Sequence, residues 1–528
     1  MKKNKEIAFI DIPTIPQQIK DLLMGKLEDF QEDTFSWDNF ERKIQAKSPF
    51  FTDEKRKVLH RVLSEQLSDF QLSEKQGFNL ESLKDKKTFT ITTGHQLNLF
   101  SGSVFFIYKI LQTIKTAEVL NQKFPDYHFV PIFWLATEDH DFEEINHFKT
   151  ATKKYQIHAE SGNAVGRIKI NDITFIKEFE RDVKCLPFGA ELVKLMKKAY
   201  QKGKTLTQAT QEVVQYLFAD RGLLFIDGDE KAFKDQMIPL FEKELQDFDL
   251  MKKSQRNRDF LTQKYGKVQV NPREINLFYL SDTRNRIVKN GEKWSVLDKD
   301  IHFTKSDLAM ELKNHPERFS PNALLRPVFQ EMVLPNLAYI GGNAEIMYWL
   351  ELKDYCKAHQ IPFPILIPRN SILFLDEKTV KKVERLNFKI DDFLGDIQSI
   401  INQKILDNHE VLALMNQQKE SLVQQFKAIK DEAVKTHISF RNLVEAEETR
   451  QLKSFERMKK RLLKAERKRH QEYVGRVEDL YQKIHPSGVW QERIFNFSEF
   501  YLFKGEKWLD FCYDVMQIKK TVLIIAEN

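Results

Sequence analysis

The stretch TFTITTGHQLNLFSG, at residues 88–102, decides the fold of this 528-residue chain. Residues 88–93 are β-branched or aromatic and end at Gly94, a pattern that predicts a short strand. Apolar residues then recur at helical spacing over residues 106–120. Residues 129–135, FVPIFWL, are almost unbroken apolar, which is typical of a strand buried on both faces of a parallel sheet. The order strand, loop, helix, strand predicts a βαβ unit.

The same pattern recurs further along the chain. GLLFID at residues 222–227 indicates a strand that ends in an acid, and ILIP at 365–368 indicates another. Short apolar runs at 324–328 and 337–340 extend the series, and a glycine pair at 341–342 opens a helix. Strands separated by helices predict an α/β fold with a doubly wound parallel sheet.

The remaining segments differ in character. Between residues 396 and 474 there is no Gly and no Pro, and apolar residues recur at three and four, as in a long helical pair or coiled coil. Two stretches are longer than a simple crossover, and we interpret them as insertions in the sheet domain. The predicted domains are an α/β core over residues 1–375 with insertions at about 150–220 and 232–320, a helical coiled-coil domain over 376–486, and a C-terminal segment over 487–528 that packs back on the core.

The composition narrows the class of partner. The net charge is +6, from 83 basic and 77 acidic residues, a mild excess that requires neither nucleic acid nor a membrane surface. Cys185, Cys356 and Cys512 are far apart and form no CxxC pair, so we expect a reducing, cytoplasmic environment. No stretch approaches the roughly 20 apolar residues of a membrane span. We therefore expect small-molecule substrates, with no nucleic-acid and no membrane partner.

The first candidate site is the loop after the first predicted strand, residues 94–103. Ligands of open α/β sheets bind at the carboxyl ends of strands, and free N–H groups at the following helix start can hold a phosphate. His95, Gln96 and Asn98 add polar side chains, and Lys109 is placed to reach an anion. The loop has neither GxGxxG nor a Walker lysine. The alternative is a polar loop that only caps the helix.

The second candidate is TEDHD at residues 137–141, directly after a buried strand, with Asn146 close behind. Adjacent carboxylates repel one another unless a metal, an ammonium group or a shared proton lies among them. Asp139 or His140 would suit a general base. The spacing matches no standard zinc pattern. The alternative is an acidic helix N-terminus, which explains His140 poorly.

The third candidate combines a buried arginine with a glycine pair. Arg326 lies in an apolar segment and needs an anionic partner there. Glycines at 341–342 allow a ligand to approach the backbone, and Glu345 and Trp349 share a helix face behind them. The alternatives are a structural salt bridge for Arg326 and a core role for Trp349. Because we expect all three segments at strand ends, a shared cleft is predicted.

Seven motifs together resemble one family, the cysteine-adding enzymes (cysteine ligases) of bacillithiol biosynthesis. The likeness covers about residues 90–500 and keeps the family's order and spacing. The motifs are TGHQLNLFSG at 93–102, YK at 108–109, WLATEDHD at 134–141, VGRI at 165–168, NALLRP at 322–327, YIGG at 339–342 and QER at 491–493. Two positions depart from the family: Asn343-Ala344-Glu345 replaces a glycine-rich stretch, and His95 stands where Gln is common.

The resemblance implies a Rossmann-like core with connecting insertions, a coiled coil that forms homodimers, and addition of cysteine to glucosaminyl-malate. An amide bond from a free carboxylate requires activation, so we expect ATP or ADP as cofactor with Mg²⁺ as its companion ion. The residues expected to be catalytic are His95, Asp139, His140 and Asp141. The residues expected to bind substrate or nucleotide are Gly94, Gln96, Asn98, Ser101, Tyr108, Lys109, Glu138, Asn146, Arg326, Tyr339, Gly341, Gly342, Glu345 and Trp349.

Two other functions remain open on the sequence alone. One is a nucleotidyl-transfer enzyme on a related α/β fold, which would release pyrophosphate from ATP without cysteine. The other is a non-enzymatic dimeric scaffold organised by the coiled coil, which would tolerate alanine substitutions in the acidic cleft.

Overall fold

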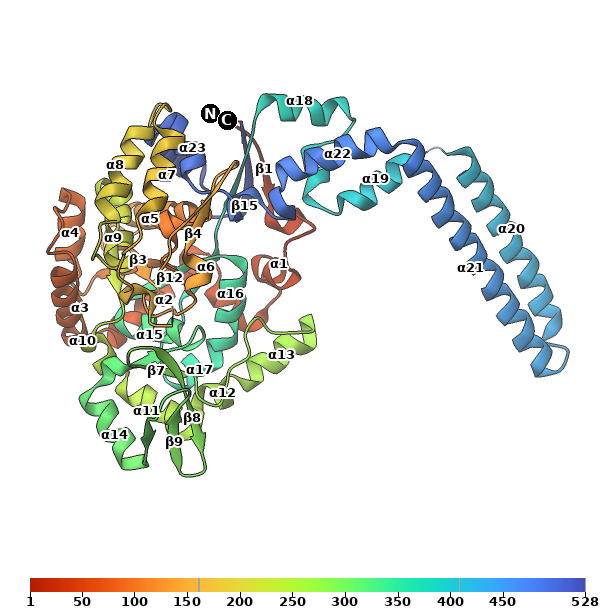
Figure 1. Cartoon of the computed structure of the whole chain (residues 1–528). Helices are drawn as coiled ribbons and strands as arrows, with labels where there is room; N and C mark the ends of the chain where they lie inside the picture. Colours follow the sequence, from red (N-terminus) through yellow and green to blue (C-terminus); the bar gives the residue numbers. More distant parts are fainter. Residues whose placement is uncertain (160–161, 408, 528) are drawn as a thin grey trace. The chain divides into compact units, whose positions relative to one another are not determined.

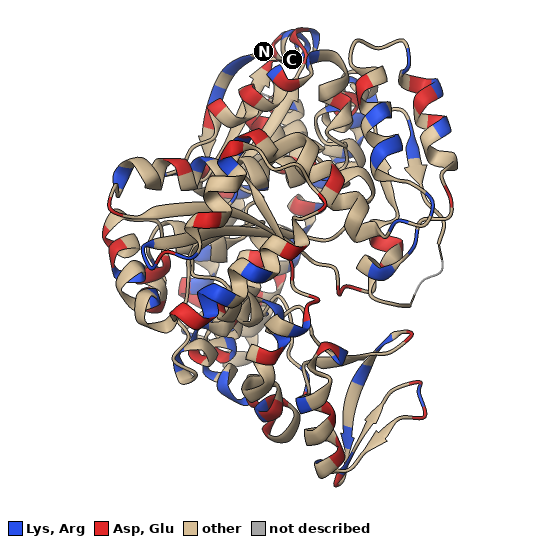
Figure 2. Ribbon diagram, turned by 90° about the vertical axis from the view of Figure 1, so that its left-hand side faces the viewer, with Lys and Arg blue, Asp and Glu red and all other residues tan. Residues whose placement is uncertain are grey.

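The computed structural model of the chain describes residues 1–159, 162–407 and 409–527 (Figure 1). These residues form two compact units: the first comprises Met1–Phe374 and Gln491–Asn528, and the second comprises Leu375–Trp490. None of the helices in the described ranges is long and apolar enough to cross a membrane. In Figure 2, Lys and Arg are interspersed with Asp and Glu along the helices, as the small net charge predicts.

The first unit is built on a five-stranded parallel sheet, which confirms the predicted fold class. The strand order is β13-β12-β2-β3-β6, with β2 in the centre. The strands are β2 (Thr88–His95), β3 (His128–Leu135), β6 (Leu224–Asp227), β12 (Asn336–Gly341) and β13 (Ile365–Pro368). The register aligns His95 with Leu135 and Leu135 with Asp227, so the carboxyl ends of β2, β3 and β6 meet at one edge.

Helices cover both faces of this sheet. Every residue of β2 before His95 is buried, and alternate side chains of a strand face opposite sides, so neither face is open to solvent. The helix α5 (Phe105–Lys123) joins β2 to β3 and packs on both. The N-terminal helices α2 (Trp37–Phe50) and α3 (Asp53–Gln66) pack on β12 and β6 respectively, while α1 (Gln17–Leu23) and α4 (Glu74–Ser82) complete the helical segment predicted before β2.

The segment between β3 and β6 is mainly helical. It contains α6 (Phe142–Ile145), a hairpin of β4 (His147–Lys149) and β5 (Lys154–Gln156), and the helices α7 (Thr174–Val183), α8 (Gly189–Ala199) and α9 (Leu206–Phe218).

The segment between β6 and β12 carries an antiparallel sheet of order β10-β9-β8-β7-β11. Its strands are β7 (Leu277–Leu280), β8 (Arg284–Asn290), β9 (Lys293–Val296), β10 (His302–Phe303) and β11 (Phe319–Pro321). Its helices are α10 (Lys231–Lys234), α11 (Ile238–Asp247), α12 (Asp249–Lys253), α13 (Gln255–Tyr265), α14 (Lys305–Asn314) and α15 (Leu325–Val333).

One predicted strand is a helix. The apolar run at residues 324–328 was grouped with the strands, but it begins α15. The side-chain oxygen of Asn322 accepts hydrogen bonds from the N–H groups of Leu324 and Leu325, which is how a helix start is capped. A short apolar run does not distinguish a strand from a buried helix, so the prediction was wrong here.

The remaining elements of the first unit follow β12. They are α16 (Asn343–Trp349), α17 (Lys353–Ala358), β14 (Ser371–Leu375), α23 (Ser498–Lys504), α24 (Glu506–Val515) and β15 (Val522–Glu527). The strand β15 lies between β14 and the N-terminal strand β1 (Lys2–Ala8), and α24 packs on α5. The chain after residue 490 is thus part of the first unit.

The second unit is helical and confirms the predicted coiled-coil domain. Its helices are α18 (Glu377–Arg385), α19 (Ile397–Leu406), α20 (Glu410–Ala433), α21 (Ile438–Arg469) and α22 (Gln471–Ile484). The long helices α20 and α21 form a hairpin, held by an apolar cluster of Leu422, Phe426, Ala433 and Val444.

Candidate active site

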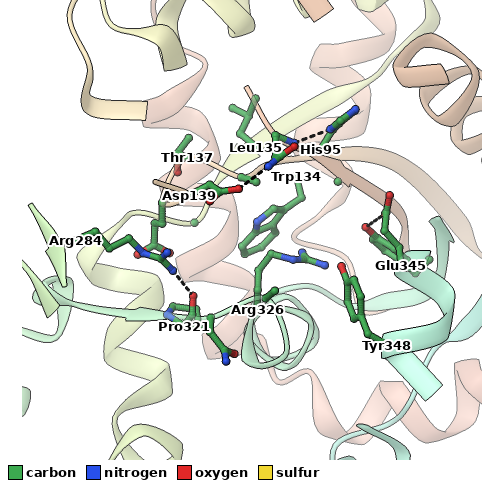
Figure 3. A pocket seen from close by; sticks show the side chains of 18 of the residues that line it. His95, Trp134, Leu135, Thr137, Asp139, Arg284, Pro321, Arg326, Glu345 and Tyr348 are labelled. Carbon is green, nitrogen blue, oxygen red and sulfur yellow. Dashed lines mark hydrogen bonds between the residues drawn. The ribbon is translucent and has the colours of Figure 1, made fainter. Parts of the chain in front are cut away.

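A cavity of about 370 Å³ opens at the carboxyl edge of the parallel sheet (Figure 3). Its walls come from the ends of β2, β3 and β12, from the starts of α15 and α16, and from β8 of the antiparallel sheet. The lining residues are Gly94, His95, Gln96, Phe105, Trp134, Leu135, Ala136, Thr137, Glu138, Asp139, Gly228, Arg284, Pro321, Asn322, Ala323, Arg326, Tyr339, Glu345 and Tyr348. The three predicted candidate segments therefore meet in one cavity.

The acidic loop after β3, residues 136–141, is the β3 loop, and it presents Asp139 to the cavity. Asp139 Oδ2 accepts a hydrogen bond from Gln96 Nε2 at 2.8 Å, and Oδ1 accepts one from the His140 N–H at 2.7 Å. Among the described residues no Lys or Arg forms an ion pair with this carboxylate, and the one basic side chain within 4 Å is His140, at 3.7 Å. Asp139 is thus free to bind an ammonium group or to accept a proton.

Glu138, the neighbouring carboxylate, is fully paired. Lys234 Nζ donates to Glu138 at 2.6 Å and to Asp229 at 3.0 Å, and this lysine is buried. Arg167 donates two hydrogen bonds to the same Asp229, at 2.8 and 2.9 Å. Two acids and two bases balance one another here, so Glu138 is held in place and its charge is neutralised within the protein.

Another acid, the partly buried Asp227, lies at the end of β6 next to the β3 loop. The Thr137 hydroxyl and the Asp229 N–H both donate to its Oδ1. Burial and the negative charge of Asp229 raise the pKa of Asp227 to about 7. The protein therefore holds a proton on this carboxyl well above the pH at which a solvated aspartate loses it.

Arg326 lies between two aromatic rings. Its guanidinium carbon is 6.0 Å from the Trp134 ring centre and 5.7 Å from that of Tyr339. Nη1 donates to Gln330 Oε1 at 3.1 Å, and the Tyr348 hydroxyl lies beside the guanidinium. The buried Nη2 makes no hydrogen bond of normal geometry to the residues that the structure describes. A donor of this kind is available to an anionic ligand in the cavity.

The carboxylate of Glu345 is paired with the buried Lys109. Lys109 Nζ donates to both of its carboxylate oxygens at 2.8 Å and also to the Gly94 carbonyl, and the Tyr339 hydroxyl donates to Oε2 at 2.8 Å. Burial acts to raise the pKa of Glu345, but the charge and hydrogen bonds of Lys109, together with the hydrogen bond from Tyr339, outweigh it, and the pKa is lowered. Lys109 is only 1% exposed, so it does not reach an anion in the cavity as predicted. Trp349 stacks behind Tyr339, with ring centres 4.6 Å apart.

The loop between β2 and α5, residues 96–104, is the β2 loop, and it uses its backbone donors internally. Phe100 donates to the Tyr200 hydroxyl at 2.6 Å, and Ser101 donates to the Asn98 carbonyl at 3.1 Å. The N–H group of the N-cap residue of α5, Val104, donates to the Phe495 carbonyl at 2.7 Å. The expected phosphate cradle is therefore not formed by these groups.

The backbone conformation of the β2 loop explains why its N–H groups are bonded within the protein. Phe100, Ser101 and Gly102 all have positive φ, which turns the chain back on itself. Asn496 Nδ2 donates to the carbonyls of Phe100 and Gly102, so the segment after residue 490 holds the turn. As a result Asn98 and Ser101 do not line the cavity, contrary to prediction.

His95 is a neutral side chain at the cavity wall. Burial lowers its pKa to about 3. The Gln96 N–H donates to Nδ1 at 2.7 Å, so the proton of the neutral ring lies on Nε2, which is buried without an acceptor among the described residues. The ring stacks on Phe105, with centres 5.1 Å apart. His95 can therefore donate a hydrogen bond but is a poor general base.

The acceptor nitrogen of His140 is also occupied, as that of His95 is. Its Nδ1 lies 2.9 Å from Arg284 Nη1, and because a guanidinium can only donate, Nδ1 is the acceptor. Burial and the positive charge of Arg284 lower the pKa of His140. The ring orients Arg284 and has no free lone pair, so the predicted role as a base is not supported by this geometry.

Six other predicted residues lie outside the cavity lining. Asp141 caps α6 by accepting from the Glu144 N–H at 3.2 Å, and Asn146 donates to Glu143 at 3.1 Å. Tyr108 is on another side of α5, packed near Trp508. The others are Gly341, Gly342 and Trp349, which pack or cap around the cavity wall; a Cβ at Gly341 would lie 3.0 Å from the Tyr339 ring.

Several lining residues were not predicted. Gly228 follows β6, and a Cβ there would lie 2.5 Å from the Trp134 ring; its place after a strand was a usable signal. Tyr348 lies one turn after Glu345 and was also within reach of sequence reasoning. Arg284 comes from an inserted sheet, and nothing in its sequence neighbourhood indicates the cavity. Within the described ranges no group of three or more His, Cys, Asp and Glu side chains could hold a metal ion.

An open parallel sheet with a charged cavity at the carboxyl ends of its strands is the arrangement of an α/β enzyme. Two family models cover nearly all of the chain: the N-terminal Rossmann-like domain of bacillithiol biosynthesis BshC matches residues 13–370, and the C-terminal coiled-coil domain of the same family matches residues 372–526. The chain belongs to the BshC family of bacillithiol biosynthesis.

Individual relatives agree with this assignment. A protein named "Putative cysteine ligase BshC" from Flavobacterium johnsoniae is 42% identical over 475 residues, which is 89% of each chain. Proteins of the same name from Flavobacterium psychrophilum and Cytophaga hutchinsonii are 40% and 37% identical. The match covers 89% of both chains for the former, and 83% of this chain and 82% of the relative for the latter.

Proposed function

We propose that this protein joins the carboxyl group of L-cysteine to the amine of glucosaminyl-malate through an amide bond, in the cytoplasm, as the last step of bacillithiol biosynthesis. The names of its relatives support a cysteine ligase. The observation that carries the proposal is the cavity itself, which places around one space the carboxylate of Asp139, with no described Lys or Arg partner, and Arg326 Nη2, with no described acceptor. An amino acid and an amino-sugar malate supply the complementary ammonium and carboxylate groups.

Asp139 is the residue we assign to proton transfer. The attacking amine must lose a proton as its nitrogen forms the C–N bond to the activated cysteine carbonyl, and the leaving group departs with the electrons of the broken C–O bond. Asp139 has no Lys or Arg partner among the described residues, so it can hold the ammonium form and then take its proton. His95, neutral and with an Nε2–H that has no acceptor among the described residues, would donate to a substrate oxygen.

Arg326 is the residue we assign to substrate anchoring. Its Nη2 group is a buried donor with no described acceptor, and its guanidinium lies against Trp134 and Tyr339. A rigidly held guanidinium binds a carboxylate with two parallel hydrogen bonds. Its natural ligand in this reaction is a malate or cysteine carboxylate.

Activation of the carboxyl group is the part of the proposal that rests on chemistry. A free carboxylate is a poor electrophile at neutral pH, so we propose that ATP converts it to an acyl phosphate or acyl adenylate, with Mg²⁺ accompanying the nucleotide. Because the N–H groups of Phe100, Ser101 and Val104 are used within the protein, phosphate contacts would come from side chains.

We also propose that the second unit forms a homodimer through the α20–α21 hairpin. Large apolar side chains on both helices are exposed, including Leu414 at 56% and Leu443 at 60%. Val434, Ile438 and Leu443, all exposed, come within ten residues of one another around the turn of the hairpin, and exposed apolar side chains that gather in this way favour association. Light scattering of the full chain should give twice the monomer mass, and Leu443→Glu should shift that mass towards the monomer.

The test of the function is mass spectrometry of the purified protein with glucosaminyl-malate, L-cysteine and Mg²⁺, with ATP in one tube and without it in another. Bacillithiol in the ATP tube alone supports the proposal as stated. Product in both tubes would remove ATP from it. Pyrophosphate release without cysteine would favour a nucleotidyl-transfer enzyme, and full activity after alanine substitutions in the cavity would contradict any role of the cavity.

A further inference from the structure

Arg284 reaches the cavity from an unexpected part of the fold. It is the first residue of β8, in the antiparallel sheet inserted between β6 and β12, and its side chain projects into the same space as that of Arg326 (Figure 3). Its backbone N–H donates to the Gly162 carbonyl at 3.0 Å, which anchors the start of the strand. The insertion therefore contributes to the cavity wall.

The guanidinium of Arg284 is buried but contacts only neutral acceptors in the described part of the chain. Nε donates to Ser320 Oγ at 3.1 Å, Nη2 to the Pro321 carbonyl at 2.8 Å, and Nη1 to His140 Nδ1 at 2.9 Å. The group lies 3.9 Å from the centre of the Phe278 ring. These four contacts fix its position without neutralising its charge.

Most other buried cations in the described part of the first unit are paired with carboxylates; the exception, Arg56, donates to three backbone carbonyls and does not line the cavity. Lys234, Lys109 and Arg369 each pair directly with a carboxylate, at 2.6, 2.8 and 2.6 Å. Arg284, only 8% exposed, has no carboxylate within 4 Å among the described residues, and the charges of Glu138 and Asp139 act on it only from further away. Burying a cation without a paired anion is costly, so the site is built for an anion that arrives with a ligand.

The hydrogen-bond count leads to the same conclusion. An arginine carries five N–H donors, and Arg284 directs three of them to Ser320, Pro321 and His140. Two remain, and a carboxylate is the group that takes two parallel N–H donors from a guanidinium. Because Arg284 lines the cavity, a ligand there has access to them.

We propose that Arg284 binds a substrate carboxylate, so that the inserted antiparallel sheet takes part in substrate recognition. The proposal rests on the proposed function, which supplies two sources of that carboxylate: the malate group of glucosaminyl-malate and the carboxyl group of L-cysteine. His140 is then a positioning residue, because its Nδ1 holds one arm of the guanidinium. A second anionic anchor beside Arg326 would fix the orientation of the substrate in the cavity.

The test is calorimetric binding of glucosaminyl-malate and of L-cysteine, each alone, to the full chain and to its Arg284→Gln variant. A loss of tenfold to a hundredfold for glucosaminyl-malate alone would assign Arg284 to malate, and the same loss for cysteine alone would assign it to the cysteine carboxylate. Glucosamine, which has no carboxylate, should bind both proteins equally. Unchanged affinity for both substrates would overturn the proposal.

Arg286→Gln is the matched control. Arg286 lies two residues further along β8 and is exposed, so its loss removes the same charge from the same strand without changing the cavity lining. Arg284→Lys is the second variant, to be used if Arg284→Gln does not fold. It keeps the positive charge but loses the paired N–H donors, so we expect it to retain part of the affinity for the substrate. If the wild-type chain binds neither substrate, the proposed function itself fails; if it binds them and both Arg284 variants bind equally well, only this inference fails.

Discussion

The loops after β2 and β3 leave adjacent strands at the same edge of the sheet, yet they use their polar groups in opposite ways. The β2 loop turns its donors inwards: three of its N–H groups bond to Tyr200, Asn98 and Phe495. In the β3 loop it is the backbone carbonyls that are bound. The Val165 N–H donates to the Asp139 carbonyl at 2.6 Å, and the Gly166 N–H donates to the Thr137 carbonyl at 2.8 Å.

This difference gives the β2 loop a structural role and leaves the β3 loop available to act on a ligand. Binding the β3 loop through its carbonyls leaves its side chains to the cavity, and Thr137, Glu138 and Asp139 all line it. Binding the β2 loop through its N–H groups removes the donors that would hold a phosphate, and only its first polar side chain, Gln96, lines the cavity. The two loops also differ in composition, because residues 96–104 contain no ionisable side chain whereas residues 136–141 contain four. Composition and the hydrogen-bond network together favour the β3 loop as the one that acts on a ligand.

The largest effect is expected from Asp139→Asn. The substitution keeps the shape but has only one acceptor oxygen, so it retains one of the two hydrogen bonds that Asp139 accepts from Gln96 and the His140 N–H, and it removes the base. General-base catalysis contributes about a hundredfold to ten-thousandfold in rate. We expect turnover to fall by that range, with little change in the unfolding temperature, as measured by single-turnover product formation. Asp141→Asn is the control, because Asp141 is in the same loop but outside the cavity lining. Wild-type turnover in Asp139→Asn would remove the base from the β3 loop.

A smaller loss is expected from Gly166→Ala, which disturbs the support of the β3 loop. A Cβ at residue 166 would lie 2.5 Å from Thr207 Oγ1 and 2.6 Å from Thr137 Cβ, so the loop must shift. Such overpacking costs about 1–3 kcal/mol, and we expect a lower unfolding temperature together with a roughly tenfold loss of turnover.

The control for this substitution is Gly77→Ala in α4, where a Cβ would meet no heavy atom within 4 Å. There the exchange should be neutral or slightly stabilising. If Gly166→Ala lowers stability but leaves turnover intact, the position of the β3 loop does not matter for the reaction, and the contrast between the loops loses its functional meaning.

Sequence reasoning worked best where the signal was local. The βαβ order was visible because residues 88–93 and 129–135 have strand patterns and α5 has a helical one, and strand ends are where ligands bind in such sheets. The prediction of a strand at residues 324–328 was wrong, because a short and mostly apolar run, here Leu-Leu-Arg-Pro-Val, fits a buried strand and a capped helix equally well.

Long-range contacts set the limit of that reasoning. Lys109 was expected to face a ligand, but its partner Glu345 is 236 residues away, and the pairing depends on how α5 and α16 pack. The β2 loop was expected to hold phosphate, but its donors and carbonyls are bound by Phe495 and Asn496, nearly 400 residues later. Arg284 reaches the cavity only through the tertiary placement of an inserted sheet.

The substitution Asn496→Ala tests whether the β2 loop has only a structural role. It removes the donor to the Phe100 and Gly102 carbonyls, at 2.7 and 2.6 Å, and leaves two buried acceptors without a partner. We expect a loss of about 2 kcal/mol in the free energy of unfolding, measured by denaturant titration, but less than a tenfold loss of turnover. Lys507→Ala, on the exposed side of the same C-terminal segment, is the control. A loss of turnover as large as that of Asp139→Asn would show that the β2 loop takes part in the reaction.

The smallest effect on turnover is expected from Asp227→Asn, which tests the proton held beneath the β3 loop. The unfolded chain releases this proton near pH 4, whereas the folded protein keeps it to about pH 7. The folded state therefore binds more protons between these values, and the contribution of Asp227 to stability falls as the pH rises from about 4 to about 7. Asparagine mimics the protonated acid and still accepts from Thr137, so the variant should gain stability relative to wild type across that range and then keep a constant advantage. Unfolding temperatures from pH 4 to pH 8 measure this, with the exposed Asp220→Asn as control. If the difference in unfolding temperature between variant and wild type does not change with pH, Asp227 is already ionised in the folded protein, and the Thr137 hydroxyl of the β3 loop donates to a charged carboxylate.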